Sequence, residues 1–218
     1  VYAGCAQPWR ASGSLVALDA LDGVERFPLD VTDTDSVTEL GAVLGGKVDI
    51  LVNNSYYLRS GGALGRMDLN TTRDEMDVHY FGALRLAGAF GPAMRARSAD
   101  GDYGAVAWIN VLSIYALVNN PVFGTYSASQ AAALSMSHCL RAELGAAGVR
   151  VVNAYLGPLD DEWHQQVPPP KLEAPVAARR IVSAVQRGGE DLPIGAIAED
   201  ILGRYLENPK EIERAIRF

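Results

Sequence analysis

The stretch "GAVAWINVLS" (104–113) decides the fold that this sequence predicts. It is almost continuously apolar, rich in β-branched and aromatic residues, and it ends on a serine. "VDILVNN" (48–54) and "VRVVNAYLG" (149–157) have the same character, and shorter runs stand at 1–4 and 24–31. Strands that are apolar along their whole length are typical of a parallel sheet buried on both faces.

Longer segments with helical patterns lie between and after these strands, at 34–45, 71–97, 124–147, 173–187 and 196–217. This alternation predicts an α/β fold: a Rossmann-like, doubly wound parallel sheet with helices on both faces. The chain has 218 residues, of which 49% are hydrophobic, and shows no internal repeat or linker. We therefore expect a single domain over 1–218 with one core.

Composition excludes several classes of function. The net charge is −7 and no block of Lys and Arg is present, which argues against nucleic-acid binding. No apolar run approaches the roughly 18 residues of a membrane span, and the three histidines lack metal-ligand spacing. The two cysteines form no pattern, so we expect buried free thiols in a reducing, cytoplasmic compartment.

Several motifs follow one another in a recognisable order. "LDVTD" (29–33), "LVNN" (51–54) and "NVLSIYA" (110–116) each close a predicted strand, and "YSASQ" (126–130) opens the next helix. With "VRVVNAYLGPLDD" and the C-terminal "NPKEIERAIRF", the chain resembles the short-chain dehydrogenase/reductase family from end to end. The resemblance implies an enzyme that binds NAD(P), with Ser113 and Tyr126 as its catalytic serine and tyrosine.

The resemblance also implies where a cofactor would lie. Asp30 and Val31 would sit beside the adenine, while Asn53 and Gly157 would line the cofactor groove. The sequence departs from the family at the nicotinamide end, however. The helical lysine is Gln130, the relay asparagine is His79, a glycine is Tyr56, and the threonine that would hold the carboxamide is Asp161.

The loss of the lysine can be expressed as an energy. A unit charge about 4 Å from a phenolate contributes roughly 4 kcal/mol at an effective dielectric near 20, which is about 3 pKa units. Gln130 can hydrogen-bond a ribose but cannot supply this field. We therefore predict that Tyr126 titrates near its ordinary pKa of about 10 and is a poor acid or base near neutral pH.

The glycine-rich phosphate loop of the family is not visible in this sequence. In the strand order 3-2-1-4-5-6, the strand before that loop is central. Either about 30 residues, one strand–helix unit, belong to the natural protein but not to this sequence, or "VYAG" (1–4) has taken the central place. In the second case "GCAQPWRASGS" (4–14) would replace the loop.

Other residues have two readings each. His79 is either a satisfied buried polar residue or a general base close to Ser113 and Tyr126. Asp161 and His164 lie in a loop that covers the substrate in the family, or they belong to a solvated loop. Aromatic walls suited to a flat or polycyclic substrate, or else simple core packing, are predicted for three residues: Tyr56, Tyr115 and Trp163.

Three functions remain open. The leading one is a non-redox enzyme that uses Ser113, Tyr126, Gln130 and, where His79 is a general base, His79 as well. It would carry out acid–base chemistry on a carbonyl or hydroxyl substrate without a conventional nicotinamide site. The second is an NAD(P)-dependent alcohol/ketone oxidoreductase in which Gln130 orients the ribose. The third is a non-catalytic binding subunit.

We also expect a homodimer or homotetramer, because two long helices carry more apolar side chains than one sheet face can cover. These side chains are Leu84, Leu86, Phe90, Met94, Leu134, Met136 and Leu140.

Overall fold

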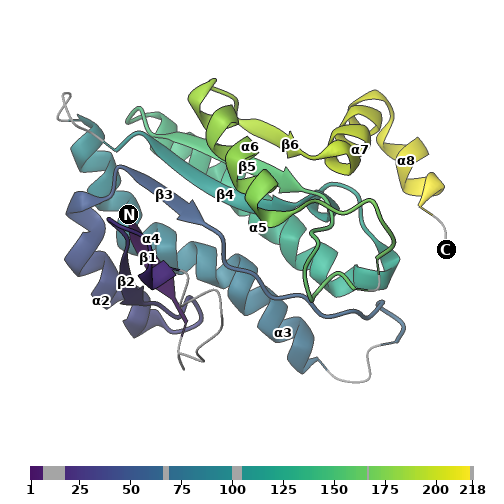
Figure 1. Ribbon diagram of the computed structural model, residues 1–218, viewed down its shortest axis with the longest axis horizontal. Coiled ribbons are helices and arrows are strands. Elements are labelled where there is room, and N and C mark those ends of the chain that lie inside the picture. Colours follow the sequence, from purple (N-terminus) through teal and green to yellow (C-terminus); the bar gives the residue numbers. More distant parts are fainter. Residues whose placement is uncertain (7–17, 66–68, 100–104, 166, 217–218) are drawn as a thin grey trace.

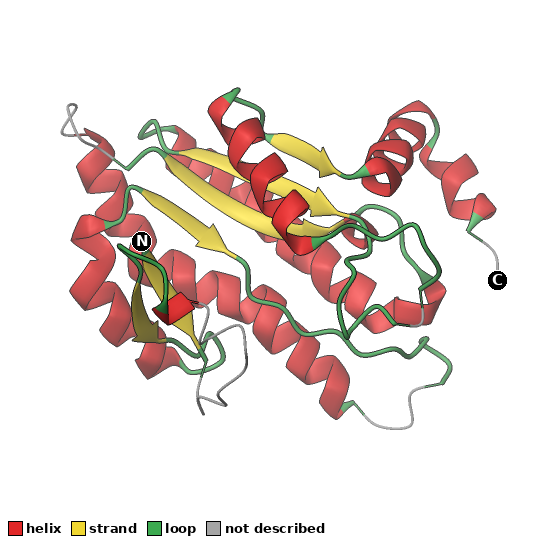
Figure 2. Cartoon of the chain, in the orientation of Figure 1, coloured by secondary structure: helices red, strands yellow, loops and turns green. Residues whose placement is uncertain are grey.

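The computed structural model describes residues 1–6, 18–65, 69–99, 105–165 and 167–216, and its strands form two parallel sheets (Figure 2). The larger sheet has the order β3 (Ile50–Asn53), β4 (Ala107–Ser113), β5 (Arg150–Leu156) and β6 (Asp191–Ile194). The smaller sheet pairs β1 (Tyr2–Cys5) with β2 (Glu25–Pro28). Every pairing is parallel, which confirms the predicted α/β architecture.

Seven helices are described with the strands: α2 (Thr34–Leu44), α3 (Asn70–Met76), α4 (Gly82–Ala99), α5 (Gly124–Gly145), α6 (Ala174–Gln186), α7 (Ala196–Glu207) and α8 (Pro209–Ala215). A π-helical segment, Asp77–Phe81, joins α3 to α4 within the helix predicted at 71–97. Such turns are frequent at functional sites. The helix predicted at 196–217 is divided at Asn208, whose side chain caps α8 just before Pro209.

Helices cover both faces of the larger sheet, as residues along β5 illustrate. Val151 and Tyr155 pack into clusters built with α4, α5 and α7. Val152 and Ala154, with the opposite parity, pack against α6. In Figure 1, α6 accordingly lies in front of the strands and α5 behind them. The alternation explains why the strand is apolar throughout its length.

The smaller sheet lies on the β3 side of the larger one (Figure 1). Among the described residues, no strand pairs with the free edge of β3, where Ile50 and Val52 are 48% and 53% exposed. Because β1 pairs with β2 and not with β3, the hypothesis that residues 1–4 occupy the central place is wrong. Most of the loop at 4–14 lies outside the described residues.

Buried polar side chains attach α5 to the sheet, a feature that the sequence did not reveal. Ser137 Oγ accepts a hydrogen bond from Asn110 Nδ2 at 2.9 Å and donates one to Asn153 Oδ1 at 2.6 Å. Asn153 Nδ2 in turn donates to Asp191 Oδ1 at 3.1 Å. Strand β6, which contains Asp191, was not predicted; its Pro193 is compatible with an edge strand.

The structure does not show the surplus of exposed apolar side chains from which the oligomer was predicted. Most of the apolar side chains counted as surplus are buried in the core of the chain itself: Leu86, Phe90, Met94, Leu134 and Leu140. Only Leu84 among the seven is largely exposed, at 48%. A homodimer or homotetramer therefore stays a prediction without this support.

Two further surface features bear on the sequence-based expectations. Both cysteines are free thiols, but Cys139 is exposed rather than buried. In the described part of the chain, none of the helices has the length and hydropathy needed to cross a bilayer.

Candidate active site

Ser113 ends β4, and two local interactions fix its position. Its Oγ accepts a hydrogen bond from the Tyr115 N–H at 3.1 Å and so caps the short 3-10 turn that follows the strand. Its own N–H donates to Gln130 Oε1 at 2.9 Å. Gln130 is only 2% exposed. Its amide oxygen therefore holds the strand end, and only the amide N–H groups are left for any contact with a ribose.

Tyr126 lies in the first turn of α5 and is 2% exposed. Burial raises the pKa of its phenol above the ordinary value of 10, and hydrogen bonds from the hydroxyls of Ser113 and Tyr56 offset part of this rise. The prediction that Tyr126 titrates near its ordinary pKa is therefore wrong. The family's lysine, which would lower the pKa, is absent, and burial raises the pKa above 10. Ser113 is less buried than Tyr126.

His79, in the π-helical segment, packs its ring edge-on against Tyr126 with centroids 5.3 Å apart. Its Nε2 must be the acceptor in its contact with the Tyr57 N–H at 3.1 Å, because a backbone N–H can only donate. Ser129 Oγ donates to the Tyr126 carbonyl at 2.8 Å, so it accepts from His79 Nδ1–H at 2.8 Å.

Both ring nitrogens of His79 are thus engaged in the neutral tautomer. Burial lowers the pKa of His79 to about 4. This arrangement favours the first of its two readings, a satisfied buried polar residue, over a general base that works near neutral pH.

The loop after β5 places a second histidine near the tyrosines. Asp161 Oδ1 accepts hydrogen bonds from the backbone N–H groups of Trp163 and His164 at 3.0 and 2.9 Å, and it lies 2.8 Å from His164 Nδ1. The Tyr56 hydroxyl lies 3.2 Å from His164 Nε2, and the two rings stack with centroids 6.1 Å apart. Tyr56 also contacts Tyr126 edge-to-face at 6.0 Å.

A cation–π contact joins the same two loops from outside. The Arg59 guanidinium lies 4.4 Å from the ring centroid of Trp163 and 4.6 Å from that of Tyr57. Tyr115, by contrast, is buried and stacks on Phe123 with centroids 6.0 Å apart. Its surroundings favour core packing over the predicted role in a substrate wall.

The residues predicted to hold a cofactor all follow the carboxyl ends of parallel strands: Asp30, Val31, Asn53 and Gly157. Ligands of open α/β sheets bind at this edge. Asp30 Oδ1 accepts from the Thr32 N–H and hydroxyl at 2.9 and 2.7 Å, and Asn53 Oδ1 accepts from the Ser55 N–H at 3.3 Å. The first three of the four are partly exposed, whereas Gly157 is buried.

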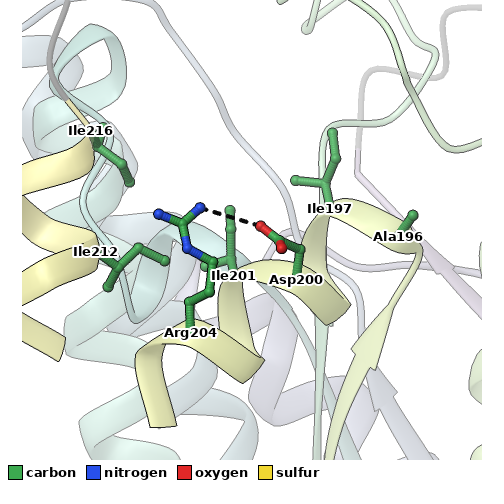
Figure 3. Close-up of a pocket in the computed structure, with 7 residues that line it drawn as sticks. All are labelled: Ala196, Ile197, Asp200, Ile201, Arg204, Ile212 and Ile216. Carbon is green, nitrogen blue, oxygen red and sulfur yellow. Dashed lines mark hydrogen bonds and ion pairs between the residues drawn. The ribbon is translucent and has the colours of Figure 1, made fainter. Parts of the chain in front are cut away.

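Two cavities of the described structure lie elsewhere. One, of about 430 Å³, is lined by α7, α8 and the residue after α8; Figure 3 shows its isoleucines around an ion pair in which Arg204 lies 3.4 Å from Asp200. The other, of about 420 Å³, is lined by Leu69 and by residues of α3 and the π-helical segment. Neither is lined by Ser113 or Tyr126.

The structure brings together most of the residues singled out in the sequence: Tyr56, His79, Ser113, Tyr126, Gln130, Asp161, Trp163 and His164. Sequence reasoning missed Ser129, which orients His79, and Arg59, which lies on Trp163. Ser129 stands inside "YSASQ", so its position one helical turn after Tyr126 was a usable signal.

Comparisons with known proteins agree with this fold. A model of the short chain dehydrogenase family matches residues 15–171. The crystal structure of a short chain dehydrogenase from Burkholderia cenocepacia J2315 in complex with NADP is 31% identical, with a TM-score of 0.85 over 100% of this chain and 86% of that one.

Two curated relatives are also similar. The short-chain dehydrogenase virD of Hypocrea virens is 28% identical over 195 residues, or 85% of this chain. The NADPH-dependent 1-acyldihydroxyacetone phosphate reductase of Schizosaccharomyces pombe is 33% identical over 140 residues, or 62% of this chain. The matched regions cover 65% and 44% of the lengths of these two relatives.

Proposed function

The chain belongs to the short-chain dehydrogenase family, and from this premise we propose that it is an oxidoreductase that uses a nicotinamide dinucleotide to interconvert an alcohol and a ketone or aldehyde. The observation that carries the proposal is that α5 holds Tyr126 close to Ser113 at the carboxyl edge of the sheet, because Gln130, one turn after Tyr126, accepts a hydrogen bond from the Ser113 N–H at 2.9 Å. Of the three functions that the sequence left open, the relatives favour this one over the leading non-redox reading.

The strand ends fit a dinucleotide in part. Asp30, Val31 and Asn53 are partly exposed at the edge where such ligands bind, and they would hold its adenine and ribose portions. Gln130 would offer its amide N–H groups to the nicotinamide ribose, since its oxygen is occupied by Ser113. The NADP bound to the Burkholderia protein favours NADP(H) over NAD(H) as the form used here.

Each residue of the pair has a distinct role. When bound, the dinucleotide supplies or accepts the hydride. Tyr126 donates a proton to the carbonyl oxygen during reduction and accepts one from the hydroxyl during oxidation. The Ser113 hydroxyl hydrogen-bonds the same oxygen and keeps it beside the phenol. Gln130 fixes Ser113, and His79 fixes Tyr126 through Ser129, so these two orient the site without exchanging protons.

The substrate class follows from the walls of the site. Tyr56 and Trp163 pack edge-to-face with centroids 6.5 Å apart and are each 37% exposed. Aromatic faces of this kind suit a flat, apolar molecule. We therefore assign an aromatic ketone, aldehyde or secondary alcohol as the substrate.

The test has two parts. Fluorescence titration of the purified protein with NADPH and NADH should show saturable binding with a preference for NADPH. Oxidation of NADPH in the presence of aromatic aldehydes and ketones should then be lost, by about a hundredfold or more, in Tyr126→Phe, while NADPH binding persists. Saturable binding of neither nucleotide would overturn the proposal and return the non-redox reading to first place.

A further inference from the structure

Trp163, which forms part of the aromatic wall proposed for the substrate, lies against a cation from a different loop. Its ring centroid is 4.4 Å from the Arg59 guanidinium, which also lies 4.6 Å from the ring centroid of Tyr57. Arg59 belongs to the loop after β3, whereas Trp163 belongs to the loop after β5. One guanidinium therefore connects the two loops from which aromatic side chains approach the site.

The loop after β3 is fixed to the core and can serve as the anchor of this contact. Arg59 Nη1 donates a hydrogen bond to the Leu58 carbonyl at 2.9 Å. The Leu58 side chain is buried in the same core cluster as Tyr126. Two residues after Arg59, the Gly61 N–H donates to the Val122 carbonyl at 2.8 Å, just before α5. The guanidinium is thus held in a fixed position relative to Tyr126.

In the loop after β5, the main chain and the ring of Trp163 are held by different groups. Its backbone N–H donates to Asp161 Oδ1 at 3.0 Å, which fixes the main chain. Its side chain is exposed, and the ring contacts Arg59 and also Tyr56, whose ring centroid is 6.5 Å away. Asp161 therefore sets where the residue lies, while Arg59 and Tyr56 set where its ring points.

We propose that Arg59 is a positioning residue, which holds the Trp163 ring in place for an aromatic substrate and so sets the KM for such substrates. The inference rests on the proposed function and deepens it, because it names what selects aromatic over aliphatic carbonyl compounds. A guanidinium is planar, is more weakly hydrated than an ammonium group and stacks on aromatic rings, so it suits this place.

The effect on KM follows from the entropy of the side chain. A large side chain that must be immobilised when a ligand arrives lowers the affinity about twofold to tenfold. Arg59 immobilises the Trp163 ring before the substrate enters, so the substrate does not bear this cost. A small aliphatic carbonyl compound covers little of the ring and gains little from it. Proton transfer by Tyr126 does not depend on the ring, so kcat should not change.

The first experiment needs neither cofactor nor substrate. The chain has three tryptophans, so in ¹⁹F NMR of protein labelled with 5-fluorotryptophan the Trp163 signal can be assigned with Trp163→Phe. We expect Arg59→Gln to shift this signal, because a cation is removed from the ring. Arg95→Gln, which removes the same charge from an exposed position of α4, should leave it in place. A Trp163 signal that is the same in Arg59→Gln as in the natural protein would overturn the inference.

The second experiment measures the reduction of 4-nitrobenzaldehyde and of propanal with NADPH. In Arg59→Gln we expect the KM for the aromatic aldehyde to rise about threefold to tenfold, while kcat and the KM for propanal change less than about twofold. Arg59→Lys keeps a cation near the ring and should recover at least half of the rise on a logarithmic scale. Arg95→Gln should match the natural protein. Equal rises for both aldehydes, or a fall in kcat alone, would overturn the inference.

A double-mutant cycle shows whether Arg59 acts through Trp163 or on the substrate itself. In a Trp163→Leu background, Arg59→Gln should raise the KM for 4-nitrobenzaldehyde less than about twofold, because the ring that Arg59 positions is gone. A rise as large as in the natural background would mean that Arg59 contacts the substrate directly, and would overturn the inference. So would a rise confined to 4-formylbenzoate, whose carboxylate a guanidinium can bind with two hydrogen bonds.

The two failures are distinguishable. If neither the natural protein nor Arg95→Gln turns over any of these aldehydes with NADPH, the proposed function fails, and the fluorine signal alone decides whether Arg59 holds Trp163. If the natural protein is active and Arg59→Gln has the same KM for 4-nitrobenzaldehyde, the inference is overturned and the oxidoreductase stands.

Discussion

Two walls enclose the phenol of Tyr126, and they hold their polar groups in different ways. The helical wall consists of His79, Ser129 and Gln130, on the π-helical segment and α5. All three are buried, and each makes a hydrogen bond with a backbone group: His79 and Gln130 accept from a backbone N–H, and Ser129 donates to a carbonyl. The loop wall consists of Tyr56, Asp161 and His164, whose tyrosine and aspartate are partly exposed and whose side chains bond to one another.

This difference in bonding partners gives the two walls different roles. A backbone N–H or C=O has a fixed role as donor or acceptor, so a side chain bonded to it is locked in one protonation state. Side chains that bond to one another can exchange those roles. The helical wall therefore orients Tyr126 and Ser113. In the loop wall Asp161 also accepts from two backbone N–H groups, whereas the contact between Tyr56 and His164 joins two side chains that can exchange the roles of donor and acceptor. Measurements of stability test this difference between the two walls.

The largest expected effect is the acid sensitivity that His79 gives to folding. The unfolded chain takes up a proton on this ring below about pH 6.5, whereas the folded protein resists it down to its pKa of about 4. Between these values the unfolded state binds more protons, so stability is complete above pH 6.5 and falls as the pH drops towards 4. The loss should total about 3 kcal/mol.

Urea unfolding of the natural protein and of His79→Asn at pH 7 and pH 4 measures this loss. The variant should lose less stability on acidification, by about the amount given above. His138→Asn, which changes an exposed histidine, should lose as much stability between pH 7 and pH 4 as the natural protein does. If all three proteins lose the same stability between pH 7 and pH 4, His79 is not held neutral in the folded state. The helical wall would then not lock its histidine in one protonation state.

A smaller effect is expected from Gln130. Gln130→Met has nearly the same shape but leaves the Ser113 N–H without its acceptor. A buried donor left unpaired costs about 1–3 kcal/mol, which urea unfolding at pH 7 can measure. Ser135→Met, at an exposed position of the same helix, should change stability by less than about 0.5 kcal/mol. If the two variants are equally stable, Gln130 does not support the strand end.

The sequence predicted the fold well where burial leaves a clear pattern. Strands buried on both faces are continuously apolar, so β5 was predicted to within one residue at each end, and β4 was predicted with its correct end but with a start at 104 instead of Ala107. Strand β6 escaped because it is four residues long, contains a proline, and begins with Asp191, which bonds to Arg141. The π-helical turn was also missed, because it keeps the apolar pattern of the helix around it.

Within the site, the sequence identified residues but not their connections. Ser113 and Tyr126 follow from the order of the motifs, and local chain geometry then brings them together. The contact between Tyr56 and His164 joins residues 108 positions apart through two loops, and no periodicity encodes it. The engagement of Gln130 with Ser113 likewise depends on how α5 packs on β4, so the sequence could name the missing lysine but not what its substitute does.

The smallest stability effect is expected in the loop wall. Asp161→Asn keeps an oxygen that can accept from the Trp163 and His164 N–H groups and from His164 Nδ1, and it removes only the negative charge. The Asp161 side chain is 26% exposed, so water screens much of its interaction with a histidine. Urea unfolding at pH 7 should therefore show a change below about 1 kcal/mol. A loss of about 2 kcal/mol or more would mean that the loop wall is as structural as the helical wall, because its hydrogen bonds would then stabilise the fold instead of remaining free to exchange protons.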